Sequence, residues 1–69
     1  MKKTGSGWTF EEALGHALRA FDEEGFSGSA QVYSHEVELK VPDLNYPLVG
    51  VDGRVYQKPW HVVTLEATP

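Results

Sequence analysis

The sequence predicts an α+β fold in which one amphipathic helix packs on a three- or four-stranded antiparallel sheet. Two observations predict it. Apolar residues first recur with a helical period and then, later in the chain, alternate with a period of two. Short connections between these segments favour antiparallel neighbours. The chain has 69 residues, about half of a typical domain, so a single small α+β domain is expected over residues 8–69.

Residues 1–7 are expected to form a flexible N-terminal arm. They contain two glycines and a serine in three consecutive positions. This composition is typical of flexible segments rather than of helices or strands.

A helix is predicted to begin after Thr9, which has the spacing of a capping box with Glu12. Gly25 followed by Phe26 is typical of a Schellman motif, so the helix is expected to end at about Glu24. Between these ends the apolar residues fall on one stripe of the helix. The residues of this stripe are Phe10, Leu14, Ala17, Leu18 and Phe21.

After the helix, a strand, a hairpin and a last strand are predicted. Over Tyr33–Val41, apolar and polar residues alternate, which predicts a half-buried strand, either continuous or divided by a bulge. Asp52-Gly53 lies between apolar runs and predicts a type I′ hairpin. Over residues 60–67 both faces are largely apolar, so this strand is expected to be central or covered on its outer side. Trp60 and Val62 share one of its faces.

The predicted core combines the helix stripe with one face of the sheet. Its members are Phe10, Leu14, Leu18, Phe21, Phe26, Val37, Leu39, Val55, Val63 and Leu65. The single helix covers only one face, so the face with Trp60 and Val62 is expected to lack cover within the chain. An uncovered apolar face indicates association with a partner.

Composition argues against several classes of function. The net charge is −4, which disfavours binding to nucleic acids and to anionic membranes. No apolar run approaches the roughly 20 residues that span a membrane, and a cytoplasmic protein is expected. There is no cysteine, so disulfides cannot stabilise this small domain. A homo-oligomer is therefore expected, because self-association is another source of stability for small domains.

No catalytic residue, metal site or cofactor is predicted. The histidines are His16, His35 and His61, and their spacing matches no common metal motif. No serine stands in a nucleophile elbow. We therefore expect a protein that is not an enzyme, the alternative being an enzyme that uses His35 or His61 with a nearby carboxylate. The acidic run 22–24 at the helix end is interpreted as a solvated face, with binding of a cation or a basic partner as the alternative.

The candidate binding site is aromatic. Tyr56, Trp60 and His61 stand close together around a proline, and Trp8 precedes the helix. Tyrosine and tryptophan are enriched where proteins bind their partners. We expect these four residues to contact a protein or a small molecule.

The segments Thr9–Leu14, Asp52–Val55 and Val62–Glu66 resemble parts of dodecins. Dodecins are small flavin-binding proteins in which a three-stranded sheet wraps around an amphipathic helix. The resemblance covers about half of the chain, and its motifs are general capping and hairpin signals. It implies a strand before the helix, where residues 1–7 stand, and a tryptophan on the strand after the helix, where Tyr33 is the nearest aromatic residue. No flavin-binding residue is carried over to this sequence.

Two functions follow from these expectations. The leading one is a non-enzymatic interaction module that self-associates through its sheet. The alternative is a small-ligand binding protein with an aromatic-lined pocket at a subunit interface, lined by Trp8, Tyr56 and Trp60. An acidic protein that covers the nucleic-acid-binding surface of another protein is a further hypothesis.

Overall fold

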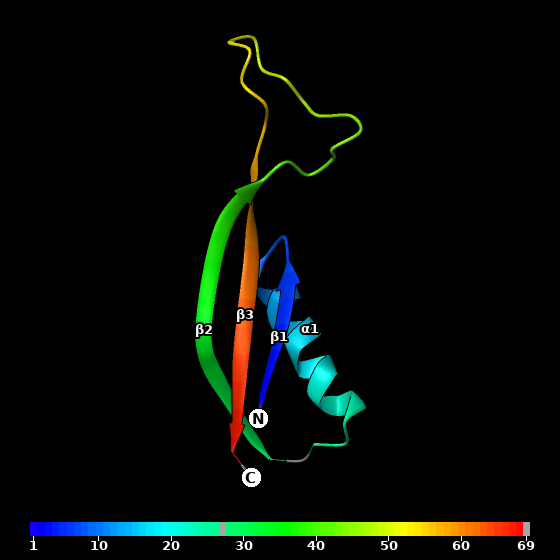
Figure 1. The fold of residues 1–69 in the computed structure, drawn as a ribbon, viewed down its shortest axis with the longest axis vertical. Helices are drawn as coiled ribbons and strands as arrows, with labels where there is room; N and C mark the ends of the chain where they lie inside the picture. The colour runs from blue at the N-terminus through cyan, green and yellow to red at the C-terminus, as the bar shows by residue number, and fades with distance from the viewer. Residues whose placement is uncertain (27, 69) are drawn as a thin grey trace.

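The computed structural model describes residues 1–26 and 28–68 and contains one helix on a three-stranded antiparallel sheet (Figure 1). The elements are β1 (Lys2–Gly7), α1 (Phe10–Glu23), β2 (Ser29–Lys40) and β3 (Lys58–Thr68). Strand β3 lies between β1 and β2. The predicted α+β class and the central place of the last strand are confirmed. Pro69, the last residue of the predicted domain, and Ser27 lie outside the described residues.

Helix α1 ends as the sequence predicts, in a Schellman motif. The Phe26 N–H donates to the Phe21 carbonyl at 3.1 Å, and the Gly25 N–H donates to the Asp22 carbonyl at 3.0 Å. Gly25 has a φ of 71°, a conformation that glycine adopts without steric cost. The rings of Phe21 and Phe26 pack together with 5.2 Å between their centroids. These contacts end the helix in a defined turn at Gly25.

The helix also begins as predicted, with the Thr9 hydroxyl accepting a hydrogen bond from the Glu12 N–H at 3.1 Å. Thr9→Ala should lower the free energy of unfolding by about 1 kcal/mol, because this backbone N–H loses its acceptor. Thermal unfolding followed by circular dichroism measures the change. Thr9→Ser keeps the hydroxyl and should retain most of the stability, and an unchanged melting temperature in Thr9→Ala would contradict the capping role.

The prediction of a flexible arm over residues 1–7 is wrong, because Lys2–Gly7 form the edge strand β1 and pair with β3. The physical reason is close packing against α1. A Cβ atom at Gly5 would overlap the backbone of Ala13 and Ala17. The glycines therefore serve the close approach of a strand to a helix rather than flexibility. Strand β1 is also the strand before the helix that the dodecin resemblance implies.

The core is thin and lies between α1, β1 and β3. The buried apolar residues are Ala13, Ala17, Phe21, Val63, Leu65 and Ala67. At the margin of this core pack the partly buried Phe10, Leu14 and Phe26. The core prediction is right for Phe21, Val63 and Leu65, whereas the buried alanines of α1 and β3 were not predicted.

Four predicted core residues are exposed instead, namely Leu18, Val37, Leu39 and Val55. Helix α1 packs on β1 and β3, and none of its Cα atoms lies within 8 Å of a Cα atom in β2, although the Phe10 side chain contacts His35 of β2. The prediction failed here because it assumed that one helix covers the whole width of the sheet. The apolar face of β2 consequently has no cover within the described residues.

Strand β2 is continuous, with a bulge between Val32 and Ser34, which settles the alternative that the sequence left open. The extra residue is Tyr33. Its ring lies 3.7 Å from the Lys2 ammonium, on the face of the sheet away from α1. Val37, by contrast, lies on the helix side, so Tyr33 does not share its face as the simple alternation predicts.

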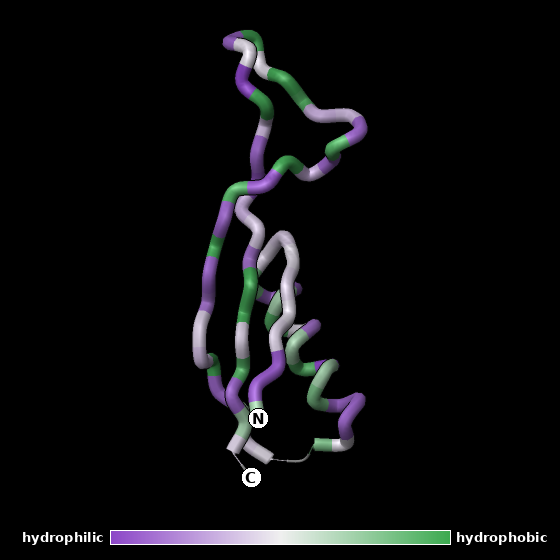
Figure 2. The backbone as a smooth tube through the Cα atoms, viewed as in Figure 1, coloured by the Kyte–Doolittle hydropathy of each residue, from purple (hydrophilic) through white to green (hydrophobic). Residues whose placement is uncertain are grey.

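Residues 41–57, here called the arm, connect β2 to β3 and project past the end of α1 (Figure 1). The molecule is elongated, with extents of 52 × 19 × 15 Å. Apolar residues recur along the whole arm (Figure 2). The arm therefore presents apolar side chains away from the core.

The tip of the arm is a short hairpin of a different type from the predicted one. The Gly50 N–H donates to the Arg54 carbonyl at 2.8 Å, and the Gly53 N–H donates to the Gly50 carbonyl at 3.0 Å. A type I′ turn needs positive φ at both Asp52 and Gly53, and only Gly53 has it, at 83°. The turn is therefore a three-residue loop that ends on glycine.

Candidate functional site

The four predicted binding residues do not form one site. Trp60 lies on the sheet face away from α1, here called the outer face, where Trp8 packs against it. Their ring centroids are 4.6 Å apart with an interplanar angle of 74°, an edge-to-face contact. Tyr56 belongs to the arm, next to β3, where it lines a pocket together with Lys58. His61 follows Trp60 on β3 and therefore points to the helix side.

Two lysines lie against these indoles. The Lys40 ammonium is 5.3 Å from the Trp60 ring centroid, and the Lys58 ammonium is 5.6 Å from the Trp8 ring centroid. Both distances are within the range of a cation–π interaction. Trp8, Trp60, Lys40 and Lys58 are here called the tryptophan–lysine cluster. Neither lysine was predicted to belong to the site, although the two-residue spacing of Lys58 and Trp60 places them on one face of a strand.

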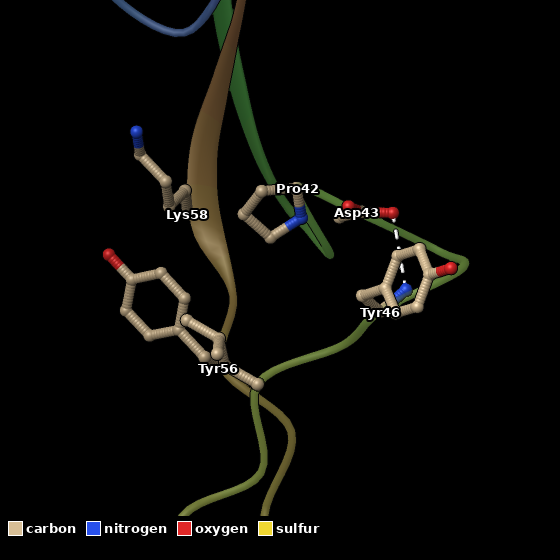
Figure 3. Close-up of a pocket in the computed structure, with 6 residues that line it drawn as sticks. Pro42, Asp43, Tyr46, Tyr56 and Lys58 are labelled. Carbon is tan, nitrogen blue, oxygen red and sulfur yellow. Dashed lines mark hydrogen bonds between the residues drawn. The ribbon is translucent and has the colours of Figure 1, made fainter.

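A pocket of about 410 Å³ adjoins this cluster at the base of the arm. Lys58 belongs to both. Figure 3 shows Tyr56 and Lys58 on one side of the pocket and Asp43 and Tyr46 on the other. Asp43 Oδ1 accepts hydrogen bonds from the backbone N–H groups of Asn45 and Tyr46, at 3.0 and 3.2 Å. This carboxylate therefore holds the turn that carries Tyr46.

His61 pairs with His35 on the helix side of the sheet. Nε2 of His35 and Nδ1 of His61 are 2.9 Å apart, and the Phe10 ring packs 4.8 Å from the His35 ring. One imidazole donates and the other accepts, so at least one ring is neutral. The pair connects β2 to β3 next to the first turn of α1. Over the described residues, no three histidine, cysteine or acidic side chains gather to hold a metal ion.

Two other polar residues hold the helix against β1. His16 Nδ1 lies 2.6 Å from the Ser6 carbonyl, a hydrogen bond between the helix and the unpaired side of β1. Glu24, in the acidic run at the helix end, forms an ion pair with Lys3 of β1. One member of the acidic run therefore has a structural partner within the chain.

The apolar side chains of β2 form a surface on the helix side. In the β2–β3 register, Val32 and Val37 pair with helix-side residues of β3, and Leu39 continues the same face. Their exposed fractions are 49%, 53% and 64%. Leu18 of α1 is also exposed, eight residues after Phe10 and so on the same flank of the helix. Leu18, Val32, Val37 and Leu39 are here called the apolar strip.

Within residues 1–26 and 28–68, no helix is both long and apolar enough to cross a membrane. Comparisons of the chain with protein-family models, curated proteins and solved structures find no match in any of the three.

Proposed function

We propose that this protein is a non-enzymatic interaction module that self-associates, with a second copy covering the apolar strip. The observation that carries the proposal is the exposed surface. The chain exposes 5086 Å², whereas a compact monomer of 7.7 kDa exposes about 4,300 Å². The excess of roughly 750 Å² is close to the ~800 Å² that each partner buries in a standard interface.

The shape of the chain supports the same proposal. The radius of gyration is 15.4 Å, whereas a compact chain of this length has about 11 Å. The internal core is thin, and no disulfide stabilises it. Burial of apolar surface between copies stabilises folded proteins as burial within a chain does.

The apolar strip is favoured over the outer face as the surface of association. On the outer face β2 presents polar side chains, such as Glu36 and Glu38, and Trp60 is already packed by Trp8. On the helix side the same strand presents Val32, Val37 and Leu39, with His35 between the two valines and hydrogen-bonded to His61. Strand β2 is also an edge strand, no other described strand pairs with its free edge, and exposed edge strands readily pair with other chains.

The arm extends the proposed contact. Its exposed apolar residues are Leu44, Tyr46, Leu48, Val49, Val51, Val55 and Tyr56. The arm continues directly from the end of β2 that carries Leu39, so a second copy seated on the apolar strip is within its reach. An apolar segment that projects from a small core is stabilised when it packs on a partner.

The experiment that tests this arrangement is isotope-filtered NMR on a mixture of labelled and unlabelled chains. Intermolecular contacts are expected at the methyl groups of Val32, Val37 and Leu39. Contacts found only at Val62 would instead place the association on the outer face. A sample without any intermolecular contact would contradict the proposal.

A further inference from the structure

The tryptophan–lysine cluster on the outer face carries an inference that is independent of self-association. The protein has a net charge of −4, yet Lys40 and Lys58 stand directly opposite each other in the β2–β3 register. Like charges in this position destabilise a sheet. A local arrangement that opposes stability is typical of functional sites.

The positive charge of the cluster is only partly compensated. Lys40 forms an ion pair with Glu38 at 3.2 Å. Across the part of the chain that the structure describes, no carboxylate forms an ion pair with Lys58. Its ammonium lies 5.6 Å from the Trp8 ring, near the outer limit of about 6 Å for a cation–π interaction. An anion can therefore contact Lys58 without displacing a carboxylate.

The two indoles supply a surface on which an aromatic ring can stack. In an edge-to-face pair, at least one ring keeps its two faces clear of the other ring. Trp8 comes from the connection between β1 and α1, and Trp60 comes from β3, so packing of the fold fixes both. A planar ring that stacks on Trp8 displaces the Lys58 ammonium from that indole. The ammonium is then free to contact an acidic group of the same ligand.

The neighbouring pocket has the volume of a small-molecule site. Its volume of about 410 Å³ is within the range of small-molecule sites, about 300 to 1,000 Å³. Tyr46 and Tyr56 form aromatic walls, and Lys58 connects the pocket to the indoles. Asp43, on the far side, disfavours an anion deep in the pocket. The acidic group of a ligand is therefore placed at the lysines.

We propose that the tryptophan–lysine cluster binds a small planar aromatic acid. The ring stacks on the pair of Trp8 and Trp60, and the acidic group lies between Lys40 and Lys58. A nucleoside monophosphate carries a planar aromatic base and, through its ribose, an acidic phosphate, and it serves as the probe.

The test follows the indole N–H signals of the two tryptophans by NMR during titration with adenosine monophosphate. Adenosine and inorganic phosphate are titrated separately at the same ionic strength. Saturable shifts of both signals are expected with the monophosphate. Adenosine should bind at least about threefold more weakly than the monophosphate. Equal affinity for adenosine, or no saturable shift at millimolar monophosphate, would overturn the proposal.

Three variants test whether Lys40 and Lys58 contact the phosphate of the probe. Lys58→Ala should weaken binding of the monophosphate by about three- to fivefold. Glu38→Gln should strengthen it, because the carboxylate no longer competes for Lys40. Lys2→Ala is the matched control, since it removes the same charge and a cation–π contact with Tyr33 elsewhere on the outer face. If Lys2→Ala and Lys58→Ala weaken binding of the monophosphate equally, general electrostatic attraction explains the binding and the proposed site is wrong.

The solution mass of each sample is measured alongside the titration. Binding that persists at unchanged mass separates this site from self-association. Loss of binding in Lys58→Ala with a changed mass would attribute the effect to assembly and overturn the proposed role of this lysine.

Discussion

Replacing Gly5 by alanine is expected to lower the free energy of unfolding by about 3 kcal/mol or more. The added Cβ atom would overlap backbone atoms of Ala13 and Ala17 in α1. Backbone atoms cannot rotate aside as the end of a flexible side chain can, so the helix must separate from β1. That separation opens the core on one of its sides.

The effect is large for this domain. A chain of this length has a free energy of unfolding of about 3 to 10 kcal/mol. Denaturation by urea, followed by circular dichroism, therefore distinguishes Gly5→Ala from the native protein. All variants are compared at one protein concentration, because self-association makes stability depend on concentration.

Gly15→Ala is the matched control for Gly5→Ala. A Cβ atom at Gly15 would meet no atom within 4 Å, and alanine is favoured over glycine inside a helix by about 1 kcal/mol. This variant should therefore be more stable than the native protein. Equal gains in stability from both substitutions would show that β1 and α1 do not approach closely.

The double substitution Val37→Gln and Leu39→Gln is expected to abolish self-association. Both side chains are largely exposed in one chain, so their replacement should change the stability of that chain little. In an interface, each replacement removes apolar burial and buries an amide instead. The combined loss is about 4 kcal/mol or more, which weakens association roughly 1,000-fold.

Glu36→Gln with Glu38→Gln is the control for this double substitution. It introduces the same side chain into the same strand, but on the outer face. Size-exclusion chromatography with light scattering should give the mass of one chain for the first variant and the native mass for the control. If the control dissociates and the first variant does not, association uses the outer face.

The ends of α1 were predictable from sequence because their signals are local. Thr9 with Glu12, and Gly25 with Phe26, each act within about one turn of the helix. Strand β1 was not predictable in this way. Glycine is required at position 5 because the backbone of Ala13 and Ala17 in α1 leaves no room for a Cβ atom. That contact forms only in the folded chain.

The exposure of β2 has a geometric cause. A helix is about 10 Å wide with its side chains, whereas neighbouring strands are about 4.8 Å apart, so one helix covers about two strands. Helix α1 lies over β1 and β3, which leaves Val32, Val37 and Leu39 of β2 exposed. The alternation correctly predicted that Val37 and Leu39 share an apolar face but wrongly placed Tyr33 on it, and alternation alone does not predict what covers a face.

The aromatic site was predictable only in part. Neighbouring residues on a strand point to opposite faces, so the separation of His61 from Trp60 follows from sequence once the strand is assigned. The contact between Trp8 and Trp60 depends on the pairing of Gly7 with His61 between β1 and β3. The sequence did not predict that pairing, because residues 1–7 were interpreted as a flexible N-terminal segment and not as a strand.

The most direct test of self-association is the mass of the native protein in solution, measured by light scattering at low micromolar concentration. Self-association through the apolar strip predicts at least twice the 7.7 kDa of one chain. A mass of one chain that persists up to millimolar concentration would contradict it.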